Sequence, residues 1–319
     1  MLKTAECVTP KHPDKICDII SDAILDECLR QDPNSRVAIE TMGGHGIVSV
    51  TGEITMNGYV DVKKVVCDLL DDKYGVQVNI VSQSPNIARG VDTGGAGDQG
   101  IMVGYACNEN KSMIPQELYL ARDLCKFIYF GYEEDGKTQI TLEDGKIHTV
   151  VASFCNVIGD NLFKLIDKWL LDKEVVEKPL IFVNPAGEWD IGGFEADTGL
   201  TGRKLAVDNY GPQIPIGGGA FSGKDPSKVD RSGAYKARQL AVQILNGLKA
   251  KEVIVKLAYS IGLAKPVMAT AIVDGKIIDI PITKELEPNE IIKSLDLKKP
   301  QYEVTAEWGH FGNNFKWDK

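Results

Sequence analysis

The sequence has no hydrophobic run long enough to cross a bilayer, and residues 1–11 lack the apolar stretch of a signal peptide. A spanning helix needs roughly 20 apolar residues in succession. Basic residues are also in the minority: the chain has 36 Lys and Arg and 45 Asp and Glu, which gives a net charge of −9. Binding an extended phosphate backbone requires a basic face. We therefore expect a cytoplasmic protein that binds neither membranes nor nucleic acid, although a local basic pocket could still hold a small phosphorylated ligand.

Paired cysteines are absent as well. The chain has seven cysteines, an odd number, and no two of them form a Cys-x-x-Cys pair. This pattern argues against a disulfide framework and against a zinc site, and it favours reduced thiols. The 319 residues, 43% of them hydrophobic and 25% charged, have an ordinary globular composition and suffice for two or three domains.

Hydrophobic periodicity predicts helices and strands that alternate along the chain. A rhythm of i, i+3, i+4, i+7 marks a helix over residues 13–29, with Pro13 in its first turn. The other predicted helices cover residues 60–70, 115–127, 159–171 and 234–248. The predicted strands cover residues 36–42, 46–55, 76–81, 101–106, 138–142, 147–155, 180–183, 252–261, 267–273 and 277–280.

Hairpins and helices alternate three times in this order. The pattern predicts an α+β fold of three similar domains, each a mixed sheet with helices on one face. The corresponding sequence segments are residues 1–92, 93–194 and 195–319, and we expect the chain to interleave between the structural domains. Two aperiodic, glycine-rich stretches, residues 82–100 and 185–232, interrupt the pattern, and such loops are often functional.

The densest chemical signal is residues 217–232, which read GGGAFSGKDPSKVDRS. Glycines let backbone N–H groups approach phosphate oxygens, and lysines supply the opposite charge. Residues 218–224 also fit the G-x-x-x-x-G-K pattern of a nucleotide-binding loop, but Asp225 and Pro226 stand where that loop needs Ser or Thr. A solvated glycine-rich loop is the alternative reading of this segment alone.

Three further clusters carry polar chemistry. His12-Pro13-Asp14-Lys15 begins the first helix, where free N–H groups attract anions, although these residues could also merely cap the helix. Asp14 and Glu6 together could hold Mg²⁺, which prefers carboxylate oxygens. The other two clusters are GAGDQG at residues 95–100 and DTGLTGRK at residues 197–204, which ends in two adjacent cations.

Together, these four motifs in this order resemble the methionine adenosyltransferase (S-adenosylmethionine synthetase) family, over residues 6–312. The resemblance implies a known fold of three similar α+β domains. It implies that methionine sulfur attacks the C5′ carbon of ATP and that the released triphosphate is hydrolysed to diphosphate and phosphate. A thioether has no proton to lose, which agrees with the absence of a Ser-His-Asp or Cys-His pattern from the sequence.

The resemblance also implies roles for individual residues. It implies nucleotide and triphosphate binding by His12, Asp135, Lys137, Trp189, Asp197, Arg203, Lys204, Ala220, Lys224 and Lys228. Of these, it implies catalytic roles for His12, Lys137, Arg203, Lys224 and Lys228. It implies methionine binding by Glu53, Gln83, Asp98, Asp197 and Asp230. It implies two Mg²⁺ ions per site with Glu6 and Asp14 as ligands, and K⁺ at Glu40.

Partners follow from the same resemblance. The substrates would be ATP and L-methionine, and the active sites would lie at the interface of a homodimer, which pairs into a tetramer in many members. Three departures from the family pattern stand out: Lys11 replaces a glycine, Glu188 replaces an arginine, and only Thr93 and Gly94 lie between Asp92 and Gly95 in the loop that gates the site. A shorter gate suggests looser closure. The alternatives are a nucleotide-loop phosphotransferase, which would form ADP, and a non-catalytic nucleotide-binding homologue.

Overall fold

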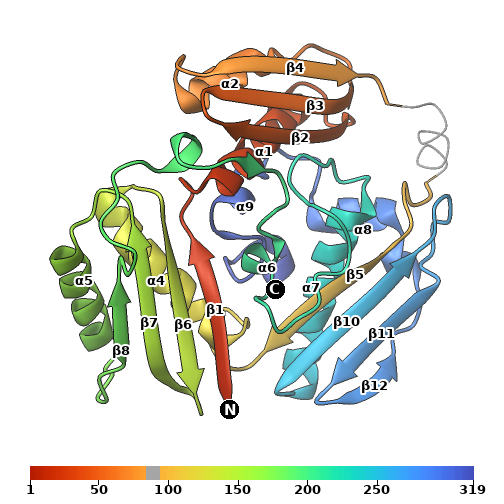
Figure 1. The fold of residues 1–319 in the computed structure, drawn as a ribbon. Helices are drawn as coiled ribbons and strands as arrows, with labels where there is room; N and C mark the ends of the chain where they lie inside the picture. Colours follow the sequence, from red (N-terminus) through yellow and green to blue (C-terminus); the bar gives the residue numbers. More distant parts are fainter. Residues whose placement is uncertain (84–93) are drawn as a thin grey trace.

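The computed structural model describes residues 1–83 and 94–319. It contains three four-stranded sheets, which Figure 1 shows around a centre that holds α6 (Leu205–Asp208), α9 (Glu303–Trp308) and the C-terminus. The predicted α+β class, with three domains of similar build, is confirmed. The described part contains no helix that is long and apolar enough to span a membrane.

The first sheet has the order β1, β6, β7, β8. Its strands are β1 (Leu2–Val8), β6 (Gly136–Glu143), β7 (Lys146–Phe154) and β8 (Leu180–Val183). β6 and β7 form the predicted hairpin, whose turn places Asp144 and Gly145 at positive φ. β8 runs parallel to β7 because α5 (Gly159–Asp172) connects them as a crossover. α4 (Gln116–Tyr132) packs against β1 and β6.

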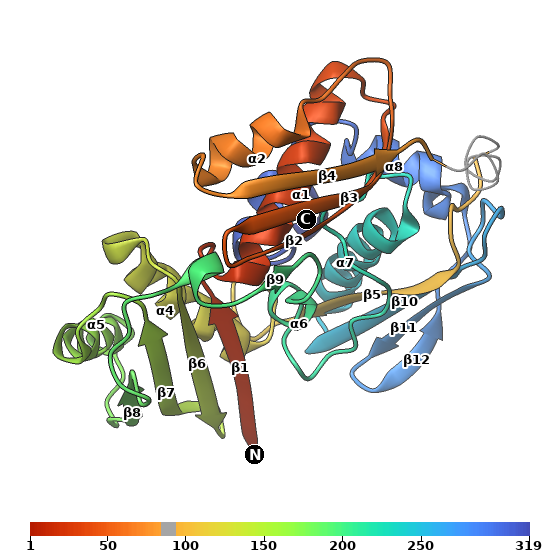
Figure 2. The ribbon, with the colours of Figure 1, turned by 45° about the horizontal axis from the view of Figure 1, so that its top comes forward.

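The second sheet has the order β4, β3, β2, β9. Its strands are β4 (Gly75–Val81), β3 (Ile47–Thr55), β2 (Arg36–Gly44) and the two-residue β9 (Gly199–Leu200). β2 alternates buried and open positions, and its buried Val37, Ile39 and Thr41 face α1 (Pro13–Gln31). α2 (Val62–Leu70) follows β3, and Figure 2 shows α1 and α2 covering one face of this sheet. The opposite face remains open.

The third sheet, β12, β11, β10, β5, is antiparallel throughout. Its strands are β12 (Lys276–Asp279), β11 (Met268–Val273), β10 (Glu252–Tyr259) and β5 (Gly100–Cys107). α7 (Val229–Leu248) packs against β5 and β10, and α8 (Pro288–Leu295) packs against α7. One hydrophobic core joins the second and third sheets through α1 and α7, whereas the first sheet has a core of its own with α4 and α5.

Some predicted boundaries are wrong. α7 begins at Val229, whereas the predicted helix begins at residue 234. The prediction misses the first turn because Asp230 and Arg231 are polar, although buried, and interrupt the apolar periodicity. β1, α8 and α9 were not predicted, because each is short and depends on packing against distant segments. The remaining predicted helices and hairpins agree with the structure to within a few residues.

Candidate functional site

The site is built outward from the N-terminus of α1. His12 is the N-cap residue, with extended backbone dihedrals, and its Nδ1 accepts the Asp14 N–H at 3.2 Å. Burial, and secondarily the positive charge of Lys204, lowers the pKa of His12 to about 3, so the imidazole is neutral at neutral pH. Because Nδ1 accepts a hydrogen bond, the neutral ring carries its proton on Nε2, which can donate to an anion.

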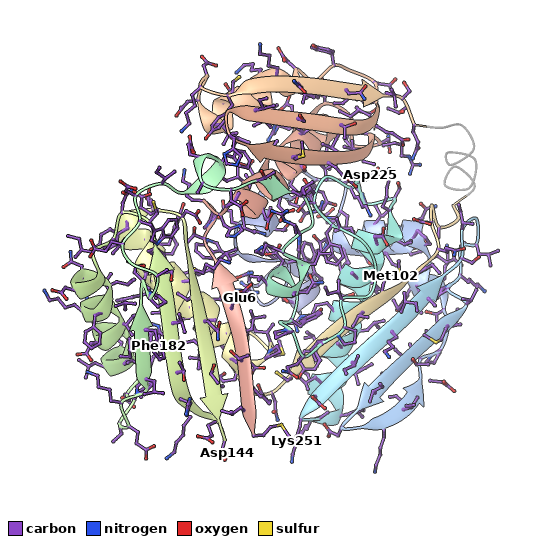
Figure 3. All side chains as sticks on the ribbon, in the orientation of Figure 1. Glu6, Met102, Asp144, Phe182, Asp225 and Lys251 are labelled. Atoms are coloured by element: carbon purple, nitrogen blue, oxygen red, sulfur yellow. The ribbon has the colours of Figure 1, made fainter. Side chains whose placement is uncertain are left out.

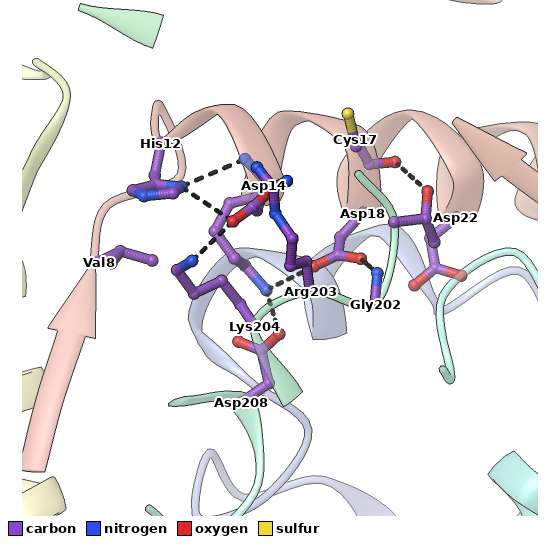
Figure 4. Close-up of polar contacts among 12 residues, drawn as sticks. Val8, His12, Asp14, Cys17, Asp18, Asp22, Gly202, Arg203, Lys204 and Asp208 are labelled. Carbon is purple, nitrogen blue, oxygen red and sulfur yellow. Dashed lines mark hydrogen bonds and ion pairs between the residues drawn. The ribbon is translucent and has the colours of Figure 1, made fainter. Parts of the chain in front are cut away.

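Asp14 gathers two cations at this helix end. Its Oδ1 accepts the Leu200 N–H at 3.0 Å and Arg203 Nε–H at 2.7 Å, and its Oδ2 pairs with Lys204 Nζ at 2.6 Å (Figure 4). Burial raises the pKa of Asp14, but the hydrogen bond from Lys204 and the N–H of Leu200 outweigh it, and the net shift is downward. His12, Asp14, Arg203 and Lys204, which we call the first group, thus form a charged cluster at the N-terminus of α1 that suits an anionic ligand.

Strands of the first sheet lie beside this group. Lys137 on β6 stands opposite Val8 on β1, and Glu6 stands two residues earlier on β1. Both Lys137 and Glu6 are exposed and share one face of the sheet, because residues two apart on a strand point the same way (Figure 3 labels Glu6). The charge of Lys137 also lowers the pKa of the His12 imidazole, which places the two side chains within electrostatic reach.

Two segments that meet at Gly193 carry the residues expected to hold the nucleoside: Asp135 directly precedes β6, and Trp189 follows β8. Asp135 is buried, and its Oδ2 accepts the Gly193 N–H at 2.8 Å. Burial raises the pKa of this carboxyl group. Trp189 is half-buried beside residues 156–158 in a hollow of about 350 Å³. Glu188 lines the same hollow, and its Oε1 accepts the Gly159 N–H at 3.1 Å at the start of α5.

A second group lies at the N-terminus of α7 and consists of Lys224, Lys228 and Asp230. Lys224 Nζ pairs with Asp230 Oδ2 at 2.6 Å, and Lys228 pairs with Asp225. Asp225 also accepts the Val37 N–H at 2.7 Å (Figure 3 labels Asp225). This hydrogen bond attaches the glycine-rich segment, residues 217–232, to β2.

The geometry of this loop differs from that of a P-loop. In the described part, no strand runs into residues 218–224, and α7 begins at Val229 rather than directly after Lys224. Ala220 packs against Gly202, whose added Cβ would lie 2.3 Å from the Ala220 Cβ. The loop therefore also touches the segment that carries the cations of the first group.

The residues expected to bind methionine are distributed between the two groups. Glu53 on β3 stands opposite Ala38 of β2, and Ala38 forms a bridge with Lys224 on the other side. Gln83 is buried, and its N–H donates to Thr55 Oγ1 at 2.9 Å. Asp98 accepts the N–H of Gln99, in the same loop as Gly100, which lies beside Asp230. Asp197 is exposed and accepts the Thr198 N–H at 2.7 Å.

Within the described protomer, no ion pair or hydrogen bond joins Asp197 to Asp230 or the first group to the second. Glu40 is exposed on β2, on the open face of the second sheet. The loop around Asp92 and Thr93 falls outside the described residues.

The carboxylates near the first group could bind Mg²⁺ only together with a phosphate ligand. No cluster of three or more His, Cys, Asp or Glu side chains converges within residues 1–83 and 94–319. Mg²⁺ that arrives with a phosphate chain needs only one or two carboxylates from the protein. The buried carboxylate of Asp14, which pairs with Arg203 and Lys204 in this structure, and the exposed carboxylate of Glu6 are the candidates for this role.

Four buried carboxylates lie along α1, and only Asp14 among them was expected to have a role; Asp14, Asp18 and Asp22 contact the segments that carry the two groups. Asp14, Asp18, Asp22 and Asp26 recur every four residues and are each at most 5% exposed. Burial raises the pKa of Asp18 to about 7 even though Lys15 lies beside it. The signal was present in the sequence as a regular acidic spacing along a helix that otherwise reads as apolar on its buried side.

The chain is similar to known proteins over nearly its whole length. Three family models match: the N-terminal, central and C-terminal domains of S-adenosylmethionine synthetase, over residues 1–85, 93–189 and 191–319. The S-adenosylmethionine synthase of Clostridium tetani is 43% identical, over 98% of this chain and 94% of that protein. That of Brachyspira hyodysenteriae is 39% identical, over 99% of this chain and 95% of that protein. A solved S-adenosylmethionine synthetase from Campylobacter jejuni, described as unusual, superposes with a TM-score of 0.89 at 34% identity, covering 100% of this chain and 96% of that one.

Proposed function

This chain belongs to the S-adenosylmethionine synthetase family, whose enzymes are methionine adenosyltransferases, and we propose the mechanism by which it makes S-adenosylmethionine from ATP and L-methionine. A lone pair of the methionine sulfur forms a bond to C5′ of ATP while the bond from C5′ to the triphosphate oxygen breaks. The electrons of that bond leave with the triphosphate, which is then hydrolysed to diphosphate and phosphate. No proton leaves the sulfur, so the first step needs no general base.

Charge stabilisation is therefore the main task of the protein. The departing triphosphate gains negative charge, and the first group offers Arg203, Lys204 and the Nε2–H of the neutral His12 at one helix end. Lys137 adds a cation from β6. The second group adds Lys224 and Lys228. Mg²⁺ bound by Asp14 and Glu6 would neutralise further phosphate charge, and K⁺ at Glu40 would order the site indirectly.

The nucleoside and methionine are held by the remaining residues. Adenine stacks on Trp189, Asp135 lies at the ribose, and Ala220 presents backbone to the nucleotide. Methionine is held by polar groups that face its ammonium group and its side chain: Glu53, Gln83, Asp98, Asp197 and Asp230. Support comes from the contact of Asp135 with Gly193, from the hollow that Trp189 lines, and from the positions of Glu53 and Asp98 near the second group.

A homodimer completes the site in this proposal, with the first group of one protomer facing the second group of its partner. The open face of the second sheet exposes four apolar side chains that a second copy would cover: Met42 at 46%, Ile47 at 48%, Val81 at 58% and Leu200 at 38% exposed. The face also carries Glu40 and borders Glu53, so covering it brings a partner to the substrates.

The observation that carries the proposal is the pairing of Asp14 with Arg203 and Lys204 at the capped end of α1, in a chain of this family. The test is to incubate the protein with ATP, methionine, Mg²⁺ and K⁺ and to detect S-adenosylmethionine by mass spectrometry. We expect methionine-dependent product with equal amounts of diphosphate and phosphate. Replacing Lys228 by Ala should lower kcat by about a hundredfold. Lys64→Ala is the matched control, since Lys64 pairs with Asp68 on the surface of α2 and should leave kcat unchanged.

The same assay separates the alternatives. Formation of ADP would indicate a phosphotransferase. Binding of ATP without any product would indicate a non-catalytic homologue. Full turnover by the Lys228→Ala variant would remove Lys228 from the triphosphate site.

A further inference from the structure

The buried aspartates of α1 accept backbone N–H groups from three distant segments. An α-helix advances about 6 Å in four residues, so Asp14, Asp18, Asp22 and Asp26 form a row along one face. Asp14 accepts the N–H of Leu200, Asp18 that of Gly202, and Asp22 that of Gly223. Asp26 accepts the N–H groups at the start of α9, from Gln301, Tyr302 and Glu303.

Two of these contacts share an unusual geometry. Gly202 has φ of +77° and Gly223 has φ of +79°, in the left-handed region that favours glycine. The N–H of each donates to its aspartate at 2.8 Å. A Cβ at Gly223 would lie 2.0 Å from the Ile39 carbonyl oxygen. A backbone N–H at such a turn has no strand partner, and the buried carboxylate supplies the acceptor that it needs.

The residues that follow these two glycines are cations of the site. Gly202 directly precedes Arg203 and Lys204, and Gly223 directly precedes Lys224. The segment before Arg203 is tied to α1 at three successive residues, because Leu200 donates to Asp14, Thr201 to the Cys17 carbonyl and Gly202 to Asp18. The contact of Gly202 with Asp18 is the last tie before the cations (Figure 4).

We propose that Asp18 is a positioning residue for the triphosphate subsite, which aims Arg203 and Lys204 by fixing the turn at Gly202. The inference rests on the proposed function for the identity of the ligand. Asp22 makes the same contact for the second group, but it also pairs with the fully buried Arg231 at 2.6 and 2.7 Å. Removing Asp22 would leave that cation buried and unpaired and would test folding as much as positioning.

Asp18 is suited to a clean test because its removal leaves no buried charge alone. Lys15 lies 3.4 Å from Asp18 Oδ2 but only 2.6 Å from Asp208 Oδ2, so Lys15 keeps its main partner in an Asp18→Ala variant. Asp18→Asn retains an oxygen acceptor for the Gly202 N–H. Asp26→Ala is the matched control, since Asp26 lies in the same row and is similarly buried but holds only the start of α9.

The experiment measures binding of Mg²⁺-tripolyphosphate by calorimetry, together with KM for ATP and for methionine, kcat and Tm, in the full-length wild type and the three variants. We expect Asp18→Ala to raise both the tripolyphosphate Kd and the KM for ATP by about tenfold while changing the KM for methionine less than about twofold. Asp18→Asn should recover most of the affinity. Asp26→Ala should lower Tm but leave all binding constants as in the wild type.

The positioning role is overturned if Asp18→Ala and Asp26→Ala behave alike, or if Asp18→Asn binds tripolyphosphate as poorly as Asp18→Ala. If Asp18→Ala does not fold, Asp18→Asn is compared with Asp18→Leu, which has a similar size but offers no acceptor to the Gly202 N–H. Affinity near that of the wild type in Asp18→Asn and loss of affinity in Asp18→Leu support the proposal, and equal affinities overturn it. A wild type that binds tripolyphosphate but forms no S-adenosylmethionine contradicts the proposed function alone, because the tripolyphosphate comparison still tests Asp18.

Discussion

Trp189 and Glu188 are neighbours in the chain whose side chains have separate tasks. Both line the hollow where adenine is proposed to stack, but only Trp189 offers a ring there, whereas the Glu188 carboxylate accepts an N–H at the start of α5. Base stacking on an aromatic ring contributes about 1–3 kcal/mol. We predict that Trp189→Ala raises the KM for ATP by about tenfold or more, whereas Trp189→Phe changes it less than about twofold.

Glu188→Ala serves as the neighbouring control for this prediction. The N-cap residue of α5, Ile158, has no capping side chain, so Glu188 provides the acceptor from outside the helix. Its loss should lower the free energy of unfolding by about 1 kcal/mol, as for other helix caps, and leave the KM for ATP unchanged. Thermal denaturation and steady-state kinetics measure the two effects separately. A large rise in KM for Glu188→Ala would place Glu188 at the nucleotide.

Several site residues could be found from sequence because their motifs are local. His12 and Asp14 stand at a predictable helix start, and Arg203 and Lys204 form an adjacent basic pair. The convergence of these two segments was not predictable from spacing, since about 190 residues separate them in the chain. Asp18 was missed for a related reason. Its role depends on the N–H of Gly202, and only the folded chain brings that group to the helix.

At the scale of elements, β5 and α7 approach each other very closely. A Cβ added to Gly104 would lie 2.0 Å from the carbonyl carbon of Ala237, so the helix rests directly on the strand. We predict that Gly104→Ala destabilises the protein by about 3 kcal/mol, because α7 must shift or the strand must strain. Gly247→Ala, in α7 itself, should stabilise by about 0.5–1 kcal/mol because the added methyl group meets open space.

Denaturant unfolding of both variants measures this difference. Equal stability of the two would show that α7 moves away from β5 at no cost. A Gly104→Ala variant that folds stably with reduced turnover would instead show that the shift reaches Asp230 at the start of α7.

Elements formed by neighbouring residues were predicted well, whereas elements completed by distant ones were not. The hairpin of β6 and β7 has a tight turn at Asp144 and Gly145, and its alternation is visible in sequence. β1 pairs with β6 across more than 130 residues, so no local pattern indicates its partner. α8 and α9 are too short for a clear apolar rhythm and owe their stability to contacts with α7 and α1.

At the scale of the whole molecule, the two site groups lead to a prediction about mixed dimers. If each active site joins the first group of one protomer to the second group of the other, His12→Ala and Lys228→Ala damage different halves. A heterodimer of the two variants then contains one site with both halves intact and one with both halves damaged. Co-expression with two affinity tags and tandem purification should yield heterodimers with about half of the wild-type activity.

The matched control for this prediction is a heterodimer of His12→Ala with Arg203→Ala, which damages the same group in both protomers and should stay inactive. Activity in both heterodimers, or in neither, would mean that the groups do not combine across a twofold interface. Size-exclusion chromatography with light scattering checks that each purified species is a dimer.

The pairing of β1 with β6 also has a consequence for how the chain is made. A ribosome releases β1 first, yet its neighbour in the sheet leaves the exit tunnel only after residue 143 has been synthesised. β5 likewise waits for β10, which ends at Tyr259. In contrast, α1, β2, β3, α2 and β4 are contiguous and can dock as soon as residue 81 emerges. We therefore expect the second sheet to form first during synthesis. Until β6 and β10 have been made, β1 and β5 have no strand partner, and these are the segments that we expect chaperones to protect.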